Sequence, residues 1–346
     1  MNILILVSSF NYGGAEKQAV LDANMLSTAH NVTMAAFEGG KLAEHINPEV
    51  RTEIFKKDNY LFTAYRLANF IRTNKIELVH NHLFAPMVIS SLASLLVKVP
   101  LIWHFHGHHF EVNKLTLRAL SRLPAVKKLL FVCSPLKKYF MEHFHFPEHK
   151  VEIVYNSTEG INPRLHANDQ QKMVIGFIGR LVALKRVEYL IDLAKYLKTN
   201  YAKPFEIQIL GDGKERDKLT DYAKKLKVEE EVKFLGFQTD LKKFYNHFNL
   251  FVLPSREEAL SLSLIDAGSA GIPSLAFDVG GNKEIVINGE TGFIVDSKDD
   301  LFEKATLLLE NKQLRDRMGR NAIRHTEIFC EKNHLQHLES IYRQYI

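Results

Sequence analysis

The sequence predicts an α/β protein with two Rossmann-like domains, each built on a doubly wound parallel sheet. Three observations support this fold class. Short apolar runs alternate with helical segments along the chain. The runs are apolar at nearly every position, which is typical of strands buried on both faces in a parallel sheet. At 346 residues the chain is long enough for two hydrophobic cores.

The strands are expected in two groups. In the first half they are expected at 3–9, 31–37, 78–82, 101–106, 128–133 and 151–155. In the second half they are expected at 173–179, 205–211, 231–236, 250–255 and 272–277. The clearest helical periodicity lies between strands, at 15–27, 186–198 and 215–228. This alternation predicts parallel sheets with helices on both faces.

A polar stretch at 156–172, with Gly160 and Pro163, separates the two groups of strands and is typical of an interdomain linker. We therefore expect an N-terminal domain at 1–165 and a C-terminal domain at 166–326. The tail at 327–346 is helical in pattern and is expected to pack back towards the N-terminal domain. Because ligands of open α/β sheets bind at the carboxyl ends of strands, a cleft between the domains is the expected site.

Composition indicates a soluble, cytoplasmic protein. Apolar residues make up 46% and charged residues 25%, and no apolar run has the roughly 20 residues that a membrane span requires. The N-terminus lacks the basic region of a signal peptide. The two cysteines, Cys133 and Cys330, lie in apolar contexts and are expected to be buried, reduced thiols.

The net charge of +5 belongs entirely to the first half, where 18 basic residues outnumber 13 acidic ones; residues 166–346 carry 27 of each. From Val112 to Met141 there is no acidic residue. In that region Arg118 and Arg122 are four residues apart, on one helical face. We expect a peripheral contact of the 112–141 region with an anionic membrane surface. Nucleic acid is disfavoured because aromatic residues are not interleaved with the basic ones; a merely solvated helix face is the remaining alternative.

Two cations follow the first strand of the second half. Arg180 and Lys185 lie in one loop that leads into a helix. A guanidinium and an ammonium beside a helix N-terminus can hold a diphosphate and stabilise the charge that develops as it leaves. Two solvated surface cations are the structural alternative.

Two carboxylates follow a later strand. Glu258 precedes Asp266 by eight residues, with Glu258 on a loop and Asp266 on the short helix that it enters. Two acceptor groups at different depths of one pocket can bind the hydroxyls of a sugar and of a ribose. Gly271, Pro273 and a buried strand come next and make the pattern more specific.

Six motifs in the second half, in this order, resemble glycosyltransferase family 4 (glycosyl transferases group 1): GRLVALKR, GDGKERDKL, VKFLGF, PSREEALSLSLIDAGSAGIP, VGGNKEIV and NGETGFIV. The first half resembles the family more loosely, through GGAEKQ, LVHNH, WHFHGHH and VCSP. The resemblance implies the two-domain GT-B architecture, with an N-terminal acceptor-binding domain at 1–165 and a C-terminal nucleotide-sugar-binding domain at 166–326. It also implies a retaining, metal-independent hexosyltransferase. A UDP-sugar donor and a glycan or lipid-linked glycan acceptor, in cell-surface polysaccharide or glycoconjugate biosynthesis, are the expected substrates.

The resemblance also implies roles for individual residues. Arg180 and Lys185 would hold the donor diphosphate, Glu258 would contact the donor sugar, and His106 would contact the acceptor or the donor sugar, so that these four are the expected catalytic residues. Asp266 would bind the ribose, although the family usually has Glu there. Further donor-binding positions are Gly13, Gly14, Gly211, Phe237, Leu260, Ser261 and Leu262. Ala259-Leu260-Ser261 stands where many members read Gly-Phe-Gly, which leaves the donor sugar open. No Asp-x-Asp pair occurs, and no cofactor is expected.

Eleven of the 16 histidines fall in the first half. His80 and His82 share one strand face, as do His104 and His106, because side chains alternate along a strand. With the family resemblance, His80, His82 and His106 are expected at the acceptor site.

Two other readings stay open. The H-x-H pairs are compatible with a zinc metallohydrolase, although His108 stands where an H-x-H-x-D-H pattern requires Asp and Glu111 is the only acid nearby. A non-catalytic nucleotide-sugar-binding subunit is the second alternative, prompted by Asp266 and the altered Gly-Phe-Gly. Nicotinamide-dependent oxidoreductases and P-loop kinases are disfavoured, because their glycine-rich motifs are missing.

Overall fold

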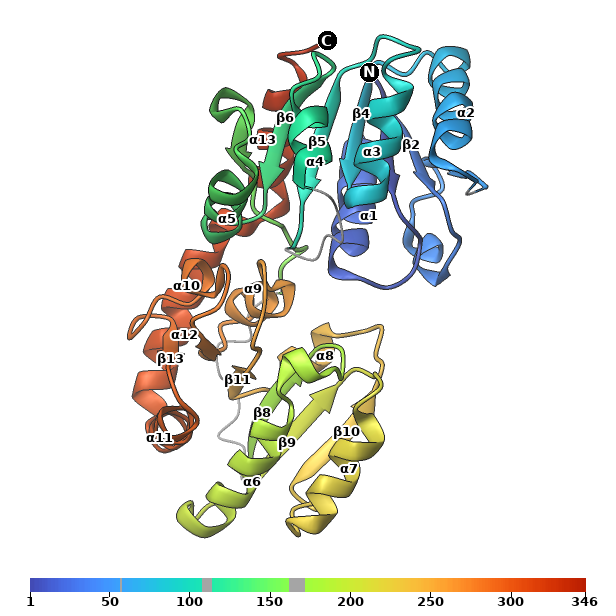
Figure 1. Ribbon diagram of the computed structural model, residues 1–346. Helices are drawn as coiled ribbons and strands as arrows, with labels where there is room; N and C mark the ends of the chain where they lie inside the picture. Colours follow the sequence, from blue (N-terminus) through green and yellow to red (C-terminus); the bar gives the residue numbers. More distant parts are fainter. Residues whose placement is uncertain (57, 108–113, 162–171) are drawn as a thin grey trace. The chain divides into compact units, whose positions relative to one another are not determined.

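The computed structural model describes residues 1–56, 58–107, 114–161 and 172–346 (Figure 1). These residues form two compact units. The first unit comprises Met1–Ser157 and Glu331–Ile346, and the second comprises Thr158–Cys330. The domain boundary expected at 165/166 lies outside the described residues, as do His108 and Glu111. The end of the chain joins the first unit from Glu331 onward, four residues later than the expected start of the C-terminal helix.

The first unit is built on a seven-stranded sheet in the order β3-β2-β1-β4-β5-β6-β7, and all its neighbouring strands are parallel. The strands are β1 (Asn2–Val7), β2 (Asn31–Ala36), β3 (Arg51–Ile54), β4 (Leu78–His82), β5 (Leu101–Phe105), β6 (Val126–Phe131) and β7 (Val151–Ile153). The helices are α1 (Gly14–Leu26), α2 (Tyr60–Thr73), α3 (Phe84–Ala93), α4 (Lys114–Ser121), α5 (Ser134–Phe144) and α13 (Glu331–Tyr342), with 3-10 turns η1 (Lys41–His45) and η2 (Glu148–Lys150).

Helices cover both faces of this sheet, because right-handed crossovers place helices on opposite faces where the strand order reverses (Figure 1). α3 packs against both α2 and α4, and α1 packs against α13. Central strands are therefore buried on both sides, and β1 is fully buried from Ile3 to Val7. The order reverses at β1, which pairs with β2 on one side and with β4 on the other.

The second unit repeats this plan with a six-stranded parallel sheet in the order β10-β9-β8-β11-β12-β13. The strands are β8 (Met173–Ile178), β9 (Phe205–Leu210), β10 (Val232–Gly236), β11 (Leu250–Leu253), β12 (Ser274–Phe277) and β13 (Gly292–Val295). The helices are α6 (Glu188–Asn200), α7 (Arg216–Lys225), α8 (Lys242–Tyr245), α9 (Leu262–Ser269), α10 (Asn282–Ile285), α11 (Lys298–Glu310) and α12 (Lys312–Thr326), with 3-10 turns η3 (Ala183–Lys185) and η4 (Glu327–Phe329).

The two sheets confirm the predicted fold class of two Rossmann-like, doubly wound α/β domains. Two strands were not expected from the sequence, β3 and β13, and both lie at the edge of a sheet. β3 reads RTEI and has little apolar character, and β13 has only four residues. Within the described residues, no helix combines the length and the apolar character needed to cross a lipid bilayer.

Candidate functional site

The second sheet reverses its strand order at β8, which pairs with both β9 and β11. In doubly wound folds the loops at the carboxyl ends of such strands form the binding site. Arg180 follows β8 and is exposed, and Lys185 ends the η3 turn in the same loop. Glu258 lies in the loop after β11. The sequence-predicted cations and the first acid therefore belong to the two loops at this point of the sheet.

The structure brings Lys185 and Glu258 together. The Lys185 Nζ donates to Glu258 Oε1 at 2.5 Å. The two side chains are 19% and 10% exposed, so the pair is partly shielded from water. The backbone N–H of Arg256 donates to the Leu184 carbonyl at 2.7 Å and joins the same two loops beside the pair. The two loops are therefore joined both by this ion pair and by a backbone hydrogen bond.

Glycine is required where the β8 loop meets the loop after β9. Gly211 has φ +127°, and a Cβ there would lie 1.9 Å from the Gly179 carbonyl oxygen. This close approach lets the Leu181 N–H donate to the Asp212 carbonyl at 2.9 Å. Gly211 therefore packs the two loops together, and its contact with a donor stays a prediction.

The predicted positions near α9 differ in exposure. Ser261 caps α9, since its hydroxyl accepts from the Leu264 N–H at 3.4 Å. Leu260 and Ser261 are buried, Leu262 is half-buried, and Phe237 is 53% exposed. A capped helix N-terminus keeps further backbone N–H groups for an anion.

Asp266 lies on α9 and is only 9% exposed. It is close enough to the buried Tyr245 that burial, and then the Asp266 charge, raise the pKa of that phenol well above its usual value. Ribose recognition by Asp266 therefore requires a ligand to reach a nearly buried carboxylate. The role stays a prediction.

In the first unit, Gly13 and Gly14 begin α1 directly after the β1 loop. A Cβ on Gly13 would lie 2.2 Å from Glu16 Oε2, whereas one on Gly14 would meet nothing within 4 Å. The carboxylate of Glu16 thus lies over the N-terminus of α1, where it favours the positive end of the helix dipole. An anionic ligand at this helix would compete with Glu16.

Histidines at the ends of β4 and β5 form a buried cluster. His80, His82 and His104 are fully buried, and the rings of His80 and His82 have centroids 4.3 Å apart. The expectation that His80 and His82 contact an acceptor directly does not fit this burial, because neither side chain reaches the surface. Of the four histidines on or directly after these two strands, His106 alone is partly exposed.

Burial favours the neutral form of the imidazoles in this cluster. Burial lowers the pKa of His80 to about 3 and that of His106 to about 4, although the Asp22 carboxylate acts in the opposite direction on both. The pKa values of His82 and His104 are also lowered, first by burial and then by their histidine neighbours. His106 is tied to the cluster, since its Nε2 lies 2.9 Å from His82 Nδ1.

A buried ion pair supports the cluster and was not found from the sequence. Asp22 of α1 lies 2.8 Å from His334 Nε2 of α13. Burial would raise the pKa of Asp22 and lower that of His334, but their mutual attraction reverses both shifts. The two residues are 312 positions apart, and the sequence held no signal to join them.

Some basic residues of the 112–141 region form ion pairs or hydrogen bonds within the first unit. Val112 and Asn113 lie outside the described residues. Lys128 pairs with Glu152 at 2.6 Å, and Arg122 donates to the carbonyls of Arg118 and His145. Lys114 and Arg118 of α4 stay exposed.

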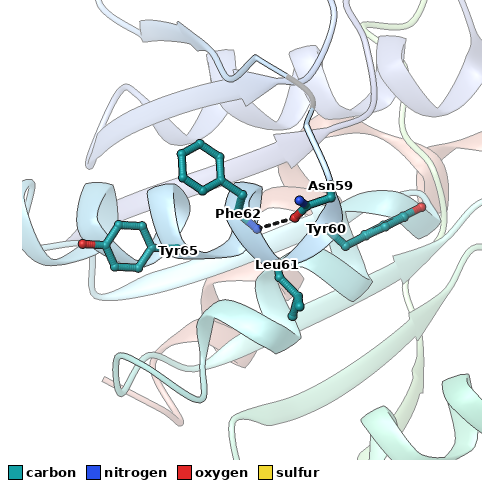
Figure 2. A pocket seen from close by; sticks show the side chains of 5 residues that line it. All are labelled: Asn59, Tyr60, Leu61, Phe62 and Tyr65. Atoms are coloured by element: carbon teal, nitrogen blue, oxygen red, sulfur yellow. Dashed lines mark hydrogen bonds between the residues drawn. The ribbon is translucent and has the colours of Figure 1, made fainter.

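A depression of about 460 Å³ lies at the start of α2, lined by Asn59, Tyr60, Leu61, Phe62 and Tyr65 (Figure 2). Its apolar side chains are exposed by 45% to 73%. Asn59 caps the helix by accepting from the Phe62 N–H at 2.8 Å. The aromatic side chains are therefore held outward on a regular helix.

Comparisons with known families cover both halves of the chain. Residues 12–159 match the family described as Glycosyltransferase Family 4, and residues 160–325 match Glycosyl transferases group 1.

Relatives and solved structures agree with these matches. The chain is 24% identical to the Escherichia coli UDP-Gal:alpha-D-GlcNAc-diphosphoundecaprenol alpha-1,3-galactosyltransferase, covering 84% of this chain and 83% of the relative. It is 26% identical to a Campylobacter jejuni alpha-1,4-N-acetyl-D-galactosaminyltransferase that is named for an undecaprenol-linked acceptor, over 93% and 92% of the two chains. The fold resembles Anabaena Alr3699/HepE, solved in complex with UDP, with a TM-score of 0.86 at 20% identity over 99% and 100% of the chains.

These findings favour sugar transfer over a metallohydrolase and over a non-catalytic subunit. The two family matches are contiguous and together span residues 12–325, and the matched solved structures share the two-domain GT-B fold. The chain therefore belongs to glycosyltransferase family 4, the group 1 glycosyl transferases, and is a glycosyltransferase.

Proposed function

We propose that the protein transfers a sugar from a UDP-sugar to a lipid-linked glycan acceptor, with retention of the anomeric configuration, in polysaccharide or glycoconjugate biosynthesis. The observation that carries the proposal is the Lys185–Glu258 pair at the switch point of the second sheet. The substrate classes are supported by relatives named for UDP-Gal and for undecaprenol-linked acceptors, and by a similar fold solved with UDP.

In this proposal, Arg180 and Lys185 bind the donor diphosphate. Lys185 exchanges its partner when the donor arrives: its ammonium leaves Glu258 for the phosphate oxygens, which carry more negative charge. The exchange frees the Glu258 carboxylate to accept a hydrogen bond from a hydroxyl of the donor sugar. The two cations then stabilise the leaving diphosphate as the glycosidic bond breaks, which is where positive charge lowers the barrier most.

The remaining roles follow from chemistry and exposure. His106 is neutral and partly exposed, so that it can accept or donate one hydrogen bond to a sugar hydroxyl. Asp266 accepts from a ribose hydroxyl. We propose retention by front-face departure, in which an oxygen of the leaving diphosphate takes the proton of the attacking acceptor hydroxyl. Arg180 and Lys185 supply the positive charge at the diphosphate, so the proposed transfer requires no metal ion.

The donor is tested by binding and then by transfer. UDP is expected to raise the melting temperature of the purified protein more than GDP or ADP does, because a ligand that binds only the native state stabilises it. A panel of UDP-sugars with an undecaprenyl-diphosphate-linked acceptor then identifies the donor, and the anomeric coupling constant of the product reports retention or inversion. A preference for GDP or ADP would refute the donor class, and an inverted product would refute the proposed stereochemistry.

We also propose that the protein is cytoplasmic and contacts an anionic membrane surface peripherally. The exposed Lys114 and Arg118 of α4 supply charge, and the 71% exposed Leu115 between them supplies apolar area. Lys128 and Arg122 contribute less, because they are engaged within the fold.

The α2 depression fits the same partner. α3 packs against both α2 and α4, so these helices cover the same side of the first sheet. The exposed Tyr60, Phe62 and Tyr65 are amphipathic or aromatic side chains of the kind that favours the interface of a bilayer (Figure 2). Such a contact would help the enzyme to find a lipid-linked acceptor, because binding to the membrane keeps the enzyme on the surface where the acceptor lies.

A further inference from the structure

Three imidazole nitrogens in the core of the first unit lack a hydrogen-bond partner among the described residues. They are His80 Nε2, His82 Nε2 and His104 Nδ1. The three side chains are fully buried on the neighbouring strands β4 and β5. One ring nitrogen of each lies within 4.8 Å of one from each of the others. Buried polar atoms are nearly always paired, so three unpaired ones in a single cluster call for an explanation.

The other nitrogen of each ring is held. His104 Nε2 donates to the Val154 carbonyl at 3.3 Å, and because a carbonyl only accepts, His104 Nδ1 keeps a bare lone pair. His80 Nδ1 lies 2.6 Å from the Tyr342 hydroxyl, and His82 Nδ1 lies 2.9 Å from His106 Nε2. Histidines that bind a metal have this arrangement, in which an outer partner fixes the ring and the opposite nitrogen is available.

A carboxylate outside that group of three histidines lies beside the unpaired nitrogen of His82. Asp22 is fully buried, and its Oδ2 lies 3.7 Å from His82 Nε2 with no hydrogen-bond partner among the described residues. Its Oδ1 is already bound by Gln18 and His334, which fixes the orientation of the carboxylate. The negative charge of Asp22 favours a cation at this place in the core.

We propose that His80, His82 and His104 bind one divalent transition metal ion of the zinc class, with Asp22 Oδ2 as the fourth ligand. Three imidazoles and one carboxylate suit zinc and its neighbours rather than magnesium or calcium, which prefer oxygen ligands alone. The three nitrogens lie at most 4.8 Å apart, and a triangle of that side has its centre about 2.8 Å from each corner. A Zn–N bond is about 2.0–2.1 Å long, so the rings must draw inward by less than about one ångström.

The site is structural and not catalytic. All four ligands are buried, and a closed four-ligand site leaves no position for water or substrate. The metal would join β4, β5 and α1 directly, and α13 through Tyr342 and His334. The proposal does not rest on the proposed function. Arg180, Lys185 and Glu258 belong to the second unit, and His106 is the one proposed catalytic residue that contacts a ligand of the site, through His82 Nδ1.

Cobalt titration of the full chain tests the proposal. Protein treated with EDTA and then dialysed is expected to bind one equivalent of Co²⁺, to show the intense visible absorption of four-coordinate cobalt, and to lose it when one equivalent of Zn²⁺ is added. The metal should also raise the melting temperature of the first unit, which the fluorescence of the single tryptophan, Trp103, reports.

Variants locate the site. His104→Gln should abolish the absorption, and Asp22→Asn should weaken cobalt binding by at least about tenfold. His143→Gln is the matched control, because His143 is exposed on α5, outside the cluster, and should leave binding unchanged.

Two outcomes would overturn the proposal. The first is wild-type protein that shows no four-coordinate absorption and no bound equivalent, a result that does not depend on any variant folding. The second is His104→Gln protein that folds and keeps the absorption. Transfer by the EDTA-treated protein, measured alongside, tests the proposed function separately.

Discussion

In the first unit the polar groups at the carboxyl ends of the central strands are buried, whereas in the second unit they are charged and partly exposed. The two sheets have the same order of strands around their switch points, β1 and β8. Yet His80, His82 and His104 lie in the core of one unit, and Arg180 lies on the surface of the other. Polar groups at equivalent places in the two sheets can therefore have different roles. Buried groups stabilise the fold, whereas exposed groups can release water and bind a ligand.

The burial of a polar cluster indicates whether its residues act mainly on stability or on a ligand. His80, His82 and His104 are fully buried, and each is bonded to another group of the first unit, so changing them should affect stability first. The Lys185–Glu258 pair keeps access to solvent and can exchange partners, so changing it should affect catalysis first. Each prediction below tests one side of this contrast.

The largest expected effect concerns the buried ion pair of the first unit. Asp22→Ala leaves the His334 charge buried without its partner, which is expected to lower the free energy of unfolding by about 3–5 kcal/mol. Urea unfolding followed by Trp103 fluorescence measures this, because the only tryptophan is buried in β5 of the first unit.

Asp221→Ala is the control for this loss, because Asp221 is 78% exposed on α7 of the second unit. It should leave the Trp103 transition unchanged. Equal stability of Asp22→Ala and the wild type, measured in EDTA, would show that the buried pair does not hold α13 to α1.

The next effect is catalytic and belongs to the second unit. Lys185→Ala removes a cation proposed to face the leaving diphosphate, and is expected to raise the barrier by about 2.7–4 kcal/mol, a loss of roughly 10²–10³ in kcat. The melting temperature should change little, because the pair is partly exposed.

Lys195→Ala is the matched control, since Lys195 is an exposed lysine on α6 of the same unit. Near wild-type turnover of Lys185→Ala at saturating donor would show that the diphosphate site has been assigned wrongly.

The sequence predicted most strands of both sheets and the charged residues of the second unit, but it did not predict two edge strands. Both sheets and their parallel strands followed from apolar runs, because a strand buried on both faces must be apolar at almost every position. β3 could not be found in this way, because an edge strand needs fewer apolar residues and RTEI has only one. β13 reads GFIV, which is apolar but only four residues long. Arg180, Lys185 and Glu258 were proposed from local motifs, and the structure places them in the loops at one switch point.

The burial of the histidine cluster in the first unit could not be predicted from the sequence. Alternation along a strand placed His80 with His82 and His104 with His106, but it does not say whether a face is covered. The cover comes from α13, whose Tyr342 and His334 reach His80 and Asp22 from the far end of the chain. Contacts between residues so distant in sequence leave no local pattern.

A third prediction concerns Asp266. Asp266→Ala is expected to raise the donor KM about 10- to 150-fold, as fits a hydrogen bond to a charged group of about 1.5–3 kcal/mol. kcat at saturating donor should fall less, because the ribose is bound alike in the ground state and the transition state. Asp266→Glu, which restores the residue usual in the family, should keep measurable activity. A large loss of kcat with an unchanged donor KM would contradict the ribose role.

The smallest expected effect tests whether the exposed charge of the first unit is also functional. Lys114 and Arg118 are exposed on α4, whereas Arg122 and Lys128 are engaged within the fold. Each basic residue near an anionic surface contributes about 1 kcal/mol. The double variant Lys114→Gln/Arg118→Gln should therefore bind anionic vesicles roughly 30-fold more weakly in sedimentation, and the control Arg122→Gln/Lys128→Gln should lose less. Transfer to a soluble acceptor analogue should be unchanged in both, because neither pair is proposed to touch a substrate. Binding that is insensitive to salt, or equal in the wild type and the first variant, would mean that α4 does not contact the membrane, and would leave the aromatic side chains of α2 as the part of the surface to change next.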